Sequence, residues 1–483
     1  MGGYLRDSLL GRAVGDLDVA VSCDPQTLAR RLAKELGGSY VALSPQRGVA
    51  RVVLPAPTAT TPEPPGLLGH TGMGLGINNA LTDSLNIDVA GFPTSIEDDL
   101  ARRDFTVNAM ALPLTDWASA QWRERVVDPY NGIRDLAEKR IRAVSASVFR
   151  DDPGRLLRAV RLAGQLRFRL EPDTARLIRT EAFQINRVSG ERVRDELLAI
   201  LAGDGARGQL EALDRLDLLC RVIPELALTK GVDQPIYHYW DVWGHLLHSV
   251  ETAELVTKGH QNSAIYTLAP WTPAVAEHFS EKVSDGHNRR TILKLTALLH
   301  DIAKPQTKGI DATGRTRFLG HSELGAEMAA SRLSELRLSA RGIAMVSKMV
   351  EQHLRPGNMR QGVDLPTSRA IYRYFRDLGD VAIDTLYLAL ADYLAAKGPE
   401  LMPDQWGGHA RIIAHILESG TRQTASEKIQ RLVTGHDLMQ ELALEPGPRV
   451  GILLEKINEA RAAGEVNTRE EALALAAKTN DQE

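Results

Sequence analysis

The chain of 483 residues has little of what marks secreted, membrane-bound or fibrous proteins. Its two cysteines, Cys23 and Cys220, are too few for a disulfide framework or a four-thiolate zinc site. No stretch approaches about 18 uncharged apolar residues, and the start of the chain lacks the apolar core of a signal peptide. Aromatic residues make up only 5% of the chain, which favours an aliphatic, largely helical core. We therefore expect a cytoplasmic globular protein of two to four domains with no membrane partner.

The net charge is also small, at −4, but the charges are unevenly distributed. Residues 134–194 contain 14 arginines and one lysine against eight acidic residues. Because a guanidinium group can pair two phosphate oxygens at once, this preference for arginine favours contact with phosphate. A solvated basic helix face is the alternative interpretation of the same excess.

The start of the chain alternates between helix and strand periodicity. The pattern predicts helices over 4–10 and 25–36, and strands over 17–21, 49–54 and 85–89. The Pro-, Thr- and Gly-rich residues 55–83 have no period, and we expect them to form an inserted loop. Helical periodicity follows Arg103 and is interrupted by a second irregular segment over 259–288.

A glycine pair and three aspartates in this first region form a candidate site. The glycines at 2–3 precede a helix, where backbone N–H groups can approach a phosphate, and Arg6 follows one turn later. Asp16 and Asp18 share one face of a strand because side chains alternate, and two such carboxylates can hold Mg²⁺. Asp88, on another predicted strand, is placed to be the third carboxylate. A hydrated Asp-x-Asp turn is the alternative for the pair taken alone.

The motifs that follow occur in a characteristic order. RRDFTVNA at 102–109 is followed by DPYNG at 128–132, DDPGRLLRAVR at 151–161 and ERVRDEL at 191–197. With the glycine pair and the aspartates, this series resembles the class II tRNA nucleotidyltransferase and bacterial poly(A) polymerase family, relatives of the polymerase β nucleotidyltransferases. The resemblance covers about residues 1–200.

The resemblance implies a role for each matching residue. In this family the aspartates bind catalytic Mg²⁺, the glycine turn and its arginine contact phosphates, the next motif orients the triphosphate and sugar, and a later Asp and Arg select the base. The corresponding residues here are, in that order, Asp16 and Asp18; Gly3 and Arg6; Arg103 and Asn108; and Asp152 and Arg155.

A helical wheel extends the last of these groups. On a helix over 155–166, Arg158 and Arg161 lie on the same side as Arg155, opposite a stripe of leucine, valine and alanine. We expect this arginine stripe to face the nucleotide. A solvent-exposed basic face is the alternative.

Three departures from the family pattern affect these expectations. The chain starts at the glycine pair, whereas the family has a helix and a strand before it, so we expect a missing sheet edge or an upstream start. Asp151 replaces the usual glutamate. Gly154 is expected inside the base-selecting helix, where glycine costs about 1 kcal/mol relative to alanine.

Histidines and aspartates in the second half form another ordered set. Imidazole and carboxylate groups on helices suit one or two ions of Mn, Fe, Ni or Co, whose bound water becomes the nucleophile. The set resembles the HD phosphohydrolase superfamily over 236–400, whereas His238 and His248 are not expected to be ligands. A structural histidine is the alternative for any single member. The expected ligands are His245, His300, Asp301, His321, His353 and Asp392.

These patterns together predict an α+β fold, with a small mixed-sheet head resembling the polymerase β nucleotidyltransferases followed by all-helical domains. The expected domains are a head at 1–142, a neck at 143–235, an HD domain at 236–400 and a tRNA-binding tail at 401–483. The implied activity is addition of CCA to tRNA, and not to DNA, from CTP and ATP with Mg²⁺, together with phosphatase or phosphodiesterase activity at the HD site. Alternatives are a poly(A) polymerase, a partial CC- or A-adding enzyme, and an HD phosphohydrolase with an inactive, truncated head. The oligomeric state stays open.

Overall fold

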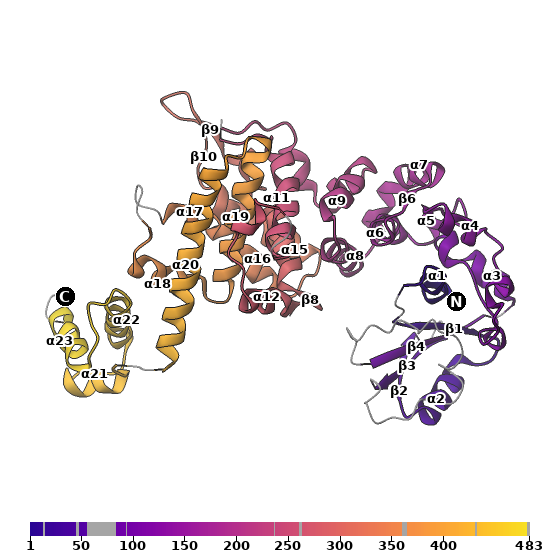
Figure 1. The fold of residues 1–483 in the computed structure, drawn as a ribbon, viewed down its shortest axis with the longest axis horizontal. Coiled ribbons are helices and arrows are strands. Elements are labelled where there is room, and N and C mark those ends of the chain that lie inside the picture. Colours follow the sequence, from indigo (N-terminus) through magenta and orange to yellow (C-terminus); the bar gives the residue numbers. More distant parts are fainter. Residues whose placement is uncertain are drawn as a thin grey trace. The chain divides into compact units, whose positions relative to one another are not determined.

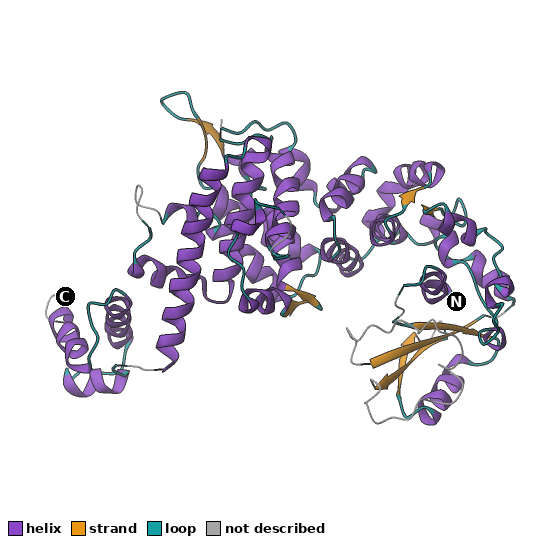
Figure 2. Cartoon of the chain, viewed as in Figure 1, coloured by secondary structure: helices purple, strands orange, loops and turns teal. Residues whose placement is uncertain are grey.

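The computed structural model describes residues 1–12, 15–44, 48–55, 84–92, 94–235, 237–259, 263–359, 365–429 and 432–480. Apart from Pro55, the loop expected over 55–83 lies outside these residues. The chain divides into two compact units: the first is Met1–Val188 with Arg215–Leu218, and the second is Ser189–Asp214 with Leu219–Glu483. The four-stranded sheet belongs to the first unit, and the second unit is built mainly of helices (Figures 1 and 2). The predicted α+β class is confirmed.

One mixed sheet organises the start of the first unit. Its strand order is β1-β4-β3-β2, with β1 parallel to β4 and the other neighbours antiparallel. The strands are β1 (Leu17–Val21), β2 (Ser39–Ser44), β3 (Val49–Pro55) and β4 (Ser84–Gly91). The sequence analysis predicted three of these strands but missed β2.

Helix α2 (Pro25–Glu35) covers one face of this sheet. It begins where the Asp24 side chain accepts a hydrogen bond from the Thr27 N–H and Pro25 fixes the first helical residue. Its alanines pack on Ala50 and Val89, which point to the same side of β3 and β4. Because side chains alternate along a strand, Asp18, Arg51 and Asp88 point to the opposite face.

The remaining helices of the first unit are short and surround the motif at 102–109. This motif forms a 3₁₀ turn, η2 (Thr106–Asn108), which contacts both α1 and α4. The helices are α1 (Gly2–Leu9), α3 (Ile96–Ala101), α4 (Gly132–Ala137), α5 (Val148–Asp151), α6 (Arg155–Leu166) and α7 (Pro172–Glu181).

Helix α6 has the bounds predicted from its periodicity, but one expectation about it is wrong. Gly154 lies at the N-cap and not inside the helix, because Asp152 is extended and separates α5 from α6. The Asp152 carboxylate accepts a hydrogen bond from the Gly154 N–H at 3.0 Å. The expected cost of an interior glycine therefore does not apply. The leucines Leu156 and Leu157 are buried, as the wheel predicted.

The second unit packs its helices around α13, which is buried along its whole length. Helix α13 contacts α8, α11, α16 and α19. Helix α12 lies in the segment that was expected to be irregular, and it begins at Thr272-Pro273 with a side-chain cap on the Val275 N–H. The main helices are α8 (Gly190–Ala202), α9 (Ala206–Arg215), α11 (Val242–Val256), α12 (Pro273–Ser280), α13 (Arg289–Leu299), α15 (His321–Glu335), α16 (Ala340–Gln352), α18 (Ser368–Leu378), α19 (Ala382–Lys397) and α20 (Pro403–Ile429).

The last helices form a separate small core around Leu438, Leu453 and Ile457. They are α21 (Gly435–Glu441), α22 (Pro448–Ala462) and α23 (Arg469–Asn480). Across the described residues, none of the helices has both the length and the apolar character needed to cross a membrane.

The packing of α4 on η2 gives a test of the fold. A Cβ at Gly132 would overlap the Thr106 carbonyl oxygen and lie 2.9 Å from the Met110 sulfur. We expect Gly132→Ala to lower the free energy of unfolding by about 1–3 kcal/mol through overpacking, measured by urea denaturation. Gly408→Ala is the control, because the described residues leave open space around that helical glycine; it should be neutral or stabilising by up to about 1 kcal/mol. Equal unfolding curves for Gly132→Ala and the unmodified chain would contradict this packing.

Candidate functional site

The three predicted carboxylates of the head lie on the sheet face opposite α2. Asp18 on β1 and Asp88 on β4 are direct partners in the parallel register, and Asp16 lies one residue before β1. Burial raises the pKa of Asp18, and the negative charges of Asp88 and Asp16 add to the increase, against the effect of Arg103. Negative charge is thus concentrated at one end of this face, which is where a divalent cation would be most favoured.

An arginine that the sequence analysis did not single out holds the third carboxylate. Arg51, on β3, donates two hydrogen bonds to Asp88, from Nε to Oδ1 at 2.7 Å and from Nη2 to Oδ2 at 2.8 Å. On β4, the Asn86 side-chain amide donates to Asp16 Oδ1 at 3.0 Å. Neither Arg51 nor Asn86 belongs to a recognisable sequence motif, and only the pairing of β3 with β4 brings Arg51 to Asp88.

The glycine pair lies directly beside the carboxylates. Gly2 has φ +63°, and a Cβ there would lie 3.0 Å from Asp18 Oδ2 and 3.3 Å from Arg103 Nη1. The absence of a side chain thus lets the start of α1 approach both an acidic and a basic group. Arg103 is also paired with Asp99 at 2.9 Å. Gly3 lies in the first turn of α1, whereas the glycine pair was expected to precede the helix.

A chain of hydrogen bonds joins α1 to α6 through the motif at 102–109. Arg6 Nη1 donates to Asn108 Oδ1 at 2.8 Å, Asn108 Nδ2 donates to Asp104 Oδ1 at 3.0 Å, and Arg158 Nε lies 2.7 Å from Asp104 Oδ2. Arg6 also pairs with Asp7 and is only 7% exposed. Arg6 and Arg158, both predicted to contact the nucleotide, therefore already have protein partners.

The predicted base-selecting residues lie in the same unit. Arg155 Nη2 donates to the Arg102 carbonyl oxygen at 2.8 Å, which places it next to the motif that carries Arg103. Asp152 lies 4.0 Å from the Arg155 Nε atom. Arg161, one turn beyond Arg158, donates to the Gln165 side chain.

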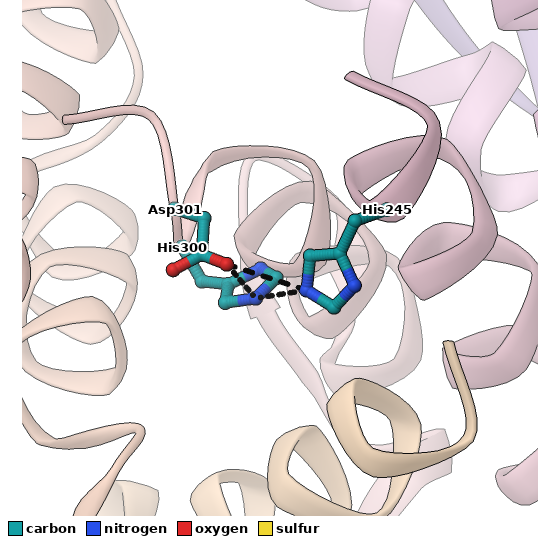
Figure 3. A group of neighbouring side chains, drawn as sticks. All are labelled: His245, His300 and Asp301. Carbon is teal, nitrogen blue, oxygen red and sulfur yellow. Dashed lines mark hydrogen bonds and ion pairs between the residues drawn. The ribbon is translucent and has the colours of Figure 1, made fainter. Parts of the chain in front are cut away.

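A second centre lies in the second unit, where helices bring histidines onto one aspartate. His245 belongs to α11, and His300 and Asp301 follow α13 directly. The Nε2 atom of His245 lies 3.2 Å from His300 Nε2 and 3.3 Å from Asp301 Oδ2, and Figure 3 shows the three side chains pointing toward one another. All three are buried.

The other three predicted ligands reach the same place. His321 Nε2 and His353 Nε2 lie 3.3 Å and 3.7 Å from Asp301 Oδ1, and Asp392 Oδ1 lies 3.1 Å from His245 Nε2. Two groups of three donor atoms, each within 4.8 Å of one another, are formed by His245, His300 and Asp301 and by Asp301, His321 and His353. Asp301 belongs to both groups, so it is placed to bridge two ions.

The donor set itself fits a metal centre. The Nδ1 atoms of His300, His321 and His353 each lie 2.6–3.0 Å from the carbonyl oxygen of the residue three positions earlier, so Nδ1–H donates and Nε2 faces Asp301. Against the effect of burial, Asp301 and Asp392 raise the pKa of His300 to about 10, so a metal ion bound by this ring would displace a proton from it. Asp301 Oδ1 and His321 Nε2 are buried without a hydrogen bond among the described residues. Burial lowers the pKa of His353 to about 4, so this ring is neutral and able to ligate near pH 7. Nitrogen and carboxylate donors of this kind suit Mn, Fe, Co or Ni.

Two further residues lie at this centre without having been predicted. Lys304 Nζ lies 2.5 Å from Asp301 Oδ2. The sequence could have indicated Lys304 by its spacing, because it follows Asp301 by three residues, which is about one helical turn. The His238 ring packs edge-on against His245 at 5.3 Å, although no spacing rule indicated it. His248 lies apart from the ligands, as expected, with its ring stacked on Trp240.

Family models match the chain in four consecutive segments. The Poly A polymerase head domain matches residues 1–142, and the RNA and SrmB-binding site of polymerase A matches 167–229. The HD domain matches 242–397, and tRNA nucleotidyltransferase domain 2 matches 415–477.

Curated relatives match along the chain to different extents. The chain is 34% identical to an A-adding tRNA nucleotidyltransferase of Deinococcus radiodurans, over 98% of the chain and 94% of that protein. It is 31% identical to a CC-adding tRNA nucleotidyltransferase of Thermus thermophilus, over 98% of the chain and 92% of that protein. A Multifunctional CCA protein of Leptothrix cholodnii is 35% identical, over 52% of the chain and 55% of that protein.

Solved structures share the fold. A Thermotoga maritima CCA-adding enzyme complexed with tRNA has a TM-score of 0.60 and 20% identity, over 99% of this chain and 90% of that one. A CCA-adding enzyme in complex with ATP has a TM-score of 0.62 and 20% identity, over 100% of this chain and 90% of that one.

The shared position of Asp301 predicts a distinct metal content for each variant. After loading with Mn²⁺ and desalting, we expect Asp301→Ala to contain two ions fewer per chain than the unmodified protein, by elemental analysis. His321→Ala should lose only one ion, because the group around His245 keeps its three donors. His248→Ala is the matched control and should keep the full content. Equal metal content in Asp301→Ala and the unmodified chain would show that this cluster binds no ion.

Proposed function

The chain belongs to the family of tRNA nucleotidyltransferases that carry a poly(A) polymerase head domain and an HD domain, and from this we propose that it adds the nucleotides of the CCA sequence to tRNA 3′ ends, using CTP and ATP. The observation that carries the proposal is the register pairing of Asp18 with Asp88, next to Asp16 and in the same compact unit as Arg155. The head carboxylates are thus assembled, which argues against an inactive head.

Each predicted site residue of the head would have a part in nucleotidyl transfer. Asp16, Asp18 and Asp88 would hold Mg²⁺, which when bound activates the RNA 3′-hydroxyl and stabilises the departing pyrophosphate. The 3′-oxygen forms a bond to the α-phosphorus, and the bond from the α-phosphorus to the bridging oxygen breaks. The lack of a side chain at Gly2 lets the start of α1 lie against Asp18, and Arg103 offers a guanidinium group at the same point, where it would pair a phosphate oxygen.

The base would be selected by Asp152 and Arg155. A carboxylate accepts and a guanidinium donates hydrogen bonds, so together they can read the edge of an unstacked cytosine or adenine. One arm of Arg155 is held by the Arg102 carbonyl oxygen at 2.8 Å, which restricts the direction of the rest of the guanidinium group. The arginine-rich neck at 143–235 and the tail at 401–483 would bind the tRNA, and the head at 1–142 would carry the chemistry.

We propose a second, separate activity for the HD domain at 236–400. The six predicted ligands would hold one or two metal ions, which when bound would supply an activated water for phosphoester hydrolysis. The chain's own contribution is to orient the ligands by the Nδ1 bonds and to place the Lys304 ammonium group beside Asp301, where it can pair a phosphate oxygen. The substrate class is a phosphomonoester or a 2′,3′-cyclic phosphate.

Addition of only part of the CCA sequence is the second candidate activity for the head. The relatives named A-adding and CC-adding match 98% of this chain, whereas the Multifunctional CCA protein of Leptothrix cholodnii matches 52%. A head that adds only part of the CCA end would fit this difference.

Defined tRNA ends distinguish these candidates. With tRNA ending at the discriminator base, we expect CTP alone to give ends in CC and CTP with ATP to give complete CCA ends, resolved by gel electrophoresis of labelled RNA. An A-adding enzyme would extend only tRNA that already ends in CC, and a CC-adding enzyme would stop there.

Two variants separate the activities in the same assay. Asp18→Asn should lose incorporation of both nucleotides but keep metal-dependent hydrolysis of a phosphomonoester. His300→Ala should show the reverse pattern. Incorporation that survives in Asp18→Asn would show that the carboxylates of β1 are not the catalytic site.

The hydrogen-bond chain predicts a kinetic effect for Arg158→Ala. Loss of the pair with Asp104 frees Asn108 and Arg6, and a charge-assisted hydrogen bond is worth about 1.5–3 kcal/mol, so kcat/KM for CTP and ATP should fall about tenfold or more. The pair is half-exposed at Arg158, so stability should change by less than about 1 kcal/mol. Arg176→Ala, which removes an exposed arginine of α7 paired with Asp173, is the control. Unchanged kinetics in Arg158→Ala would mean that the arginine stripe is only a solvated surface.

A further inference from the structure

Arg51 lies in a row of residues that crosses the whole sheet at the catalytic end. In the strand registers Val41 is opposite Arg51, Arg51 is opposite Asp88, and Asp88 is opposite Asp18. All four side chains therefore point to the face opposite α2. Arg51 contacts Asp88 from the side of β3. The side of the Asp88 carboxylate that faces β1 and Asp18 is therefore available to other groups.

The contact between Arg51 and Asp88 fixes the plane of the carboxylate. The two parallel hydrogen bonds, at 2.7 Å and 2.8 Å, form a bidentate pair, which restrains rotation as well as position. Each carboxylate oxygen has two lone pairs, so the pair with Arg51 leaves one on each oxygen for a cation. The hydrogen bonds to Asp88 raise the pKa of Arg51, which keeps the guanidinium group charged.

Arg51 also offsets the repulsion among the three carboxylates. Its Nη2 atom lies 3.9 Å from Asp16 Oδ2, so one positive charge faces two of the three acids. Within the described residues, the close groups of donor atoms lie only around Asp301 and not at the head. Each of these two acids accepts hydrogen bonds from a neighbour on the sheet, Asp16 from Asn86 and Asp88 from Arg51.

We propose that Arg51 is a positioning residue for nucleotidyl transfer, which acts by fixing the orientation of Asp88 toward Asp18. This inference rests on the proposed function, in which Asp88 is the third carboxylate of the transferase site. The required property is the planar, two-pronged guanidinium group and not positive charge alone.

Kinetics of two variants test the inference. We expect Arg51→Gln to lower kcat for CTP incorporation by about 10–100-fold, the usual effect of losing a group that orients a metal ligand, with KM for CTP unchanged within about twofold. Arg51→Lys keeps the positive charge but loses the planar, two-pronged guanidinium group, so kcat for CTP incorporation should fall by a similar factor. Arg31→Gln removes an exposed arginine of α2 that is paired with Glu35, and it should match the unmodified chain. An unchanged kcat in Arg51→Gln, a loss confined to KM, or full activity in Arg51→Lys would each overturn the inference.

A structural measurement tests it without reference to activity. In a crystal structure of Arg51→Gln we expect the Asp88 carboxylate to turn from its present plane or to occupy more than one orientation. An Asp88 carboxylate that keeps its plane in that variant would overturn the inference.

A third variant separates this inference from the proposed function. If Asp88→Asn is inactive and Arg51→Gln is fully active, only the role of Arg51 is wrong. If Asp88→Asn incorporates CTP at the normal rate, the third carboxylate is misassigned and the role of Arg51 fails with it. Loss of activity in Asp88→Asn with a reduced kcat in Arg51→Gln supports both.

Discussion

Both centres concentrate negative charge in a small volume, and the arrangement of the other residues depends on the need to stabilise that charge. A carboxylate removed from water is costly unless it has a partner, so each centre must supply positive charge or hydrogen-bond donors in a fixed geometry. At the head, strand register provides these groups, with Arg51 and Asn86 one or two strands from the acids they hold. In the HD domain, helix ends provide them, and Asp301, 1% exposed, lies among four histidines and Lys304.

The two centres differ in what could be predicted from the sequence. The six residues of the HD centre were predicted as ligands from their order, because each one is a residue type that binds metals and follows a helical pattern. The shared position of Asp301 could not be found in that way, since it depends on how α11 and α16 pack on α13 and how α15 packs on α16. His238 was missed for the same reason: its contact with His245 is made by the segment before α11 and has no fixed spacing.

At the head, alternation along a strand predicted that Asp16 and Asp18 share one face, and the register of β1 with β4 brings Asp88 beside Asp18. The partner of Asp88 was not predictable, because Arg51 reaches it only through the pairing of β3 with β4, which are far apart in sequence. Periodicity gave the bounds of α6 correctly, whereas the family motif led us to expect Gly154 inside a helix, since the motif does not show that Asp152 is extended. Strand β2 was missed, and its exposed Val41 and Leu43 show that it lacks a fully buried pattern.

The linked side chains from α6 to α1 have a consequence for anyone who redesigns the base preference. Arg158, Asp104, Asn108 and Arg6 form one continuous series of contacts, so under the proposed function the residues that would read the base and those that would face the phosphates are mechanically connected. Substitutions on α6 alone would then alter the positioning of every incoming nucleotide, whatever its base. New specificity would have to be engineered together with compensating changes in the first helix.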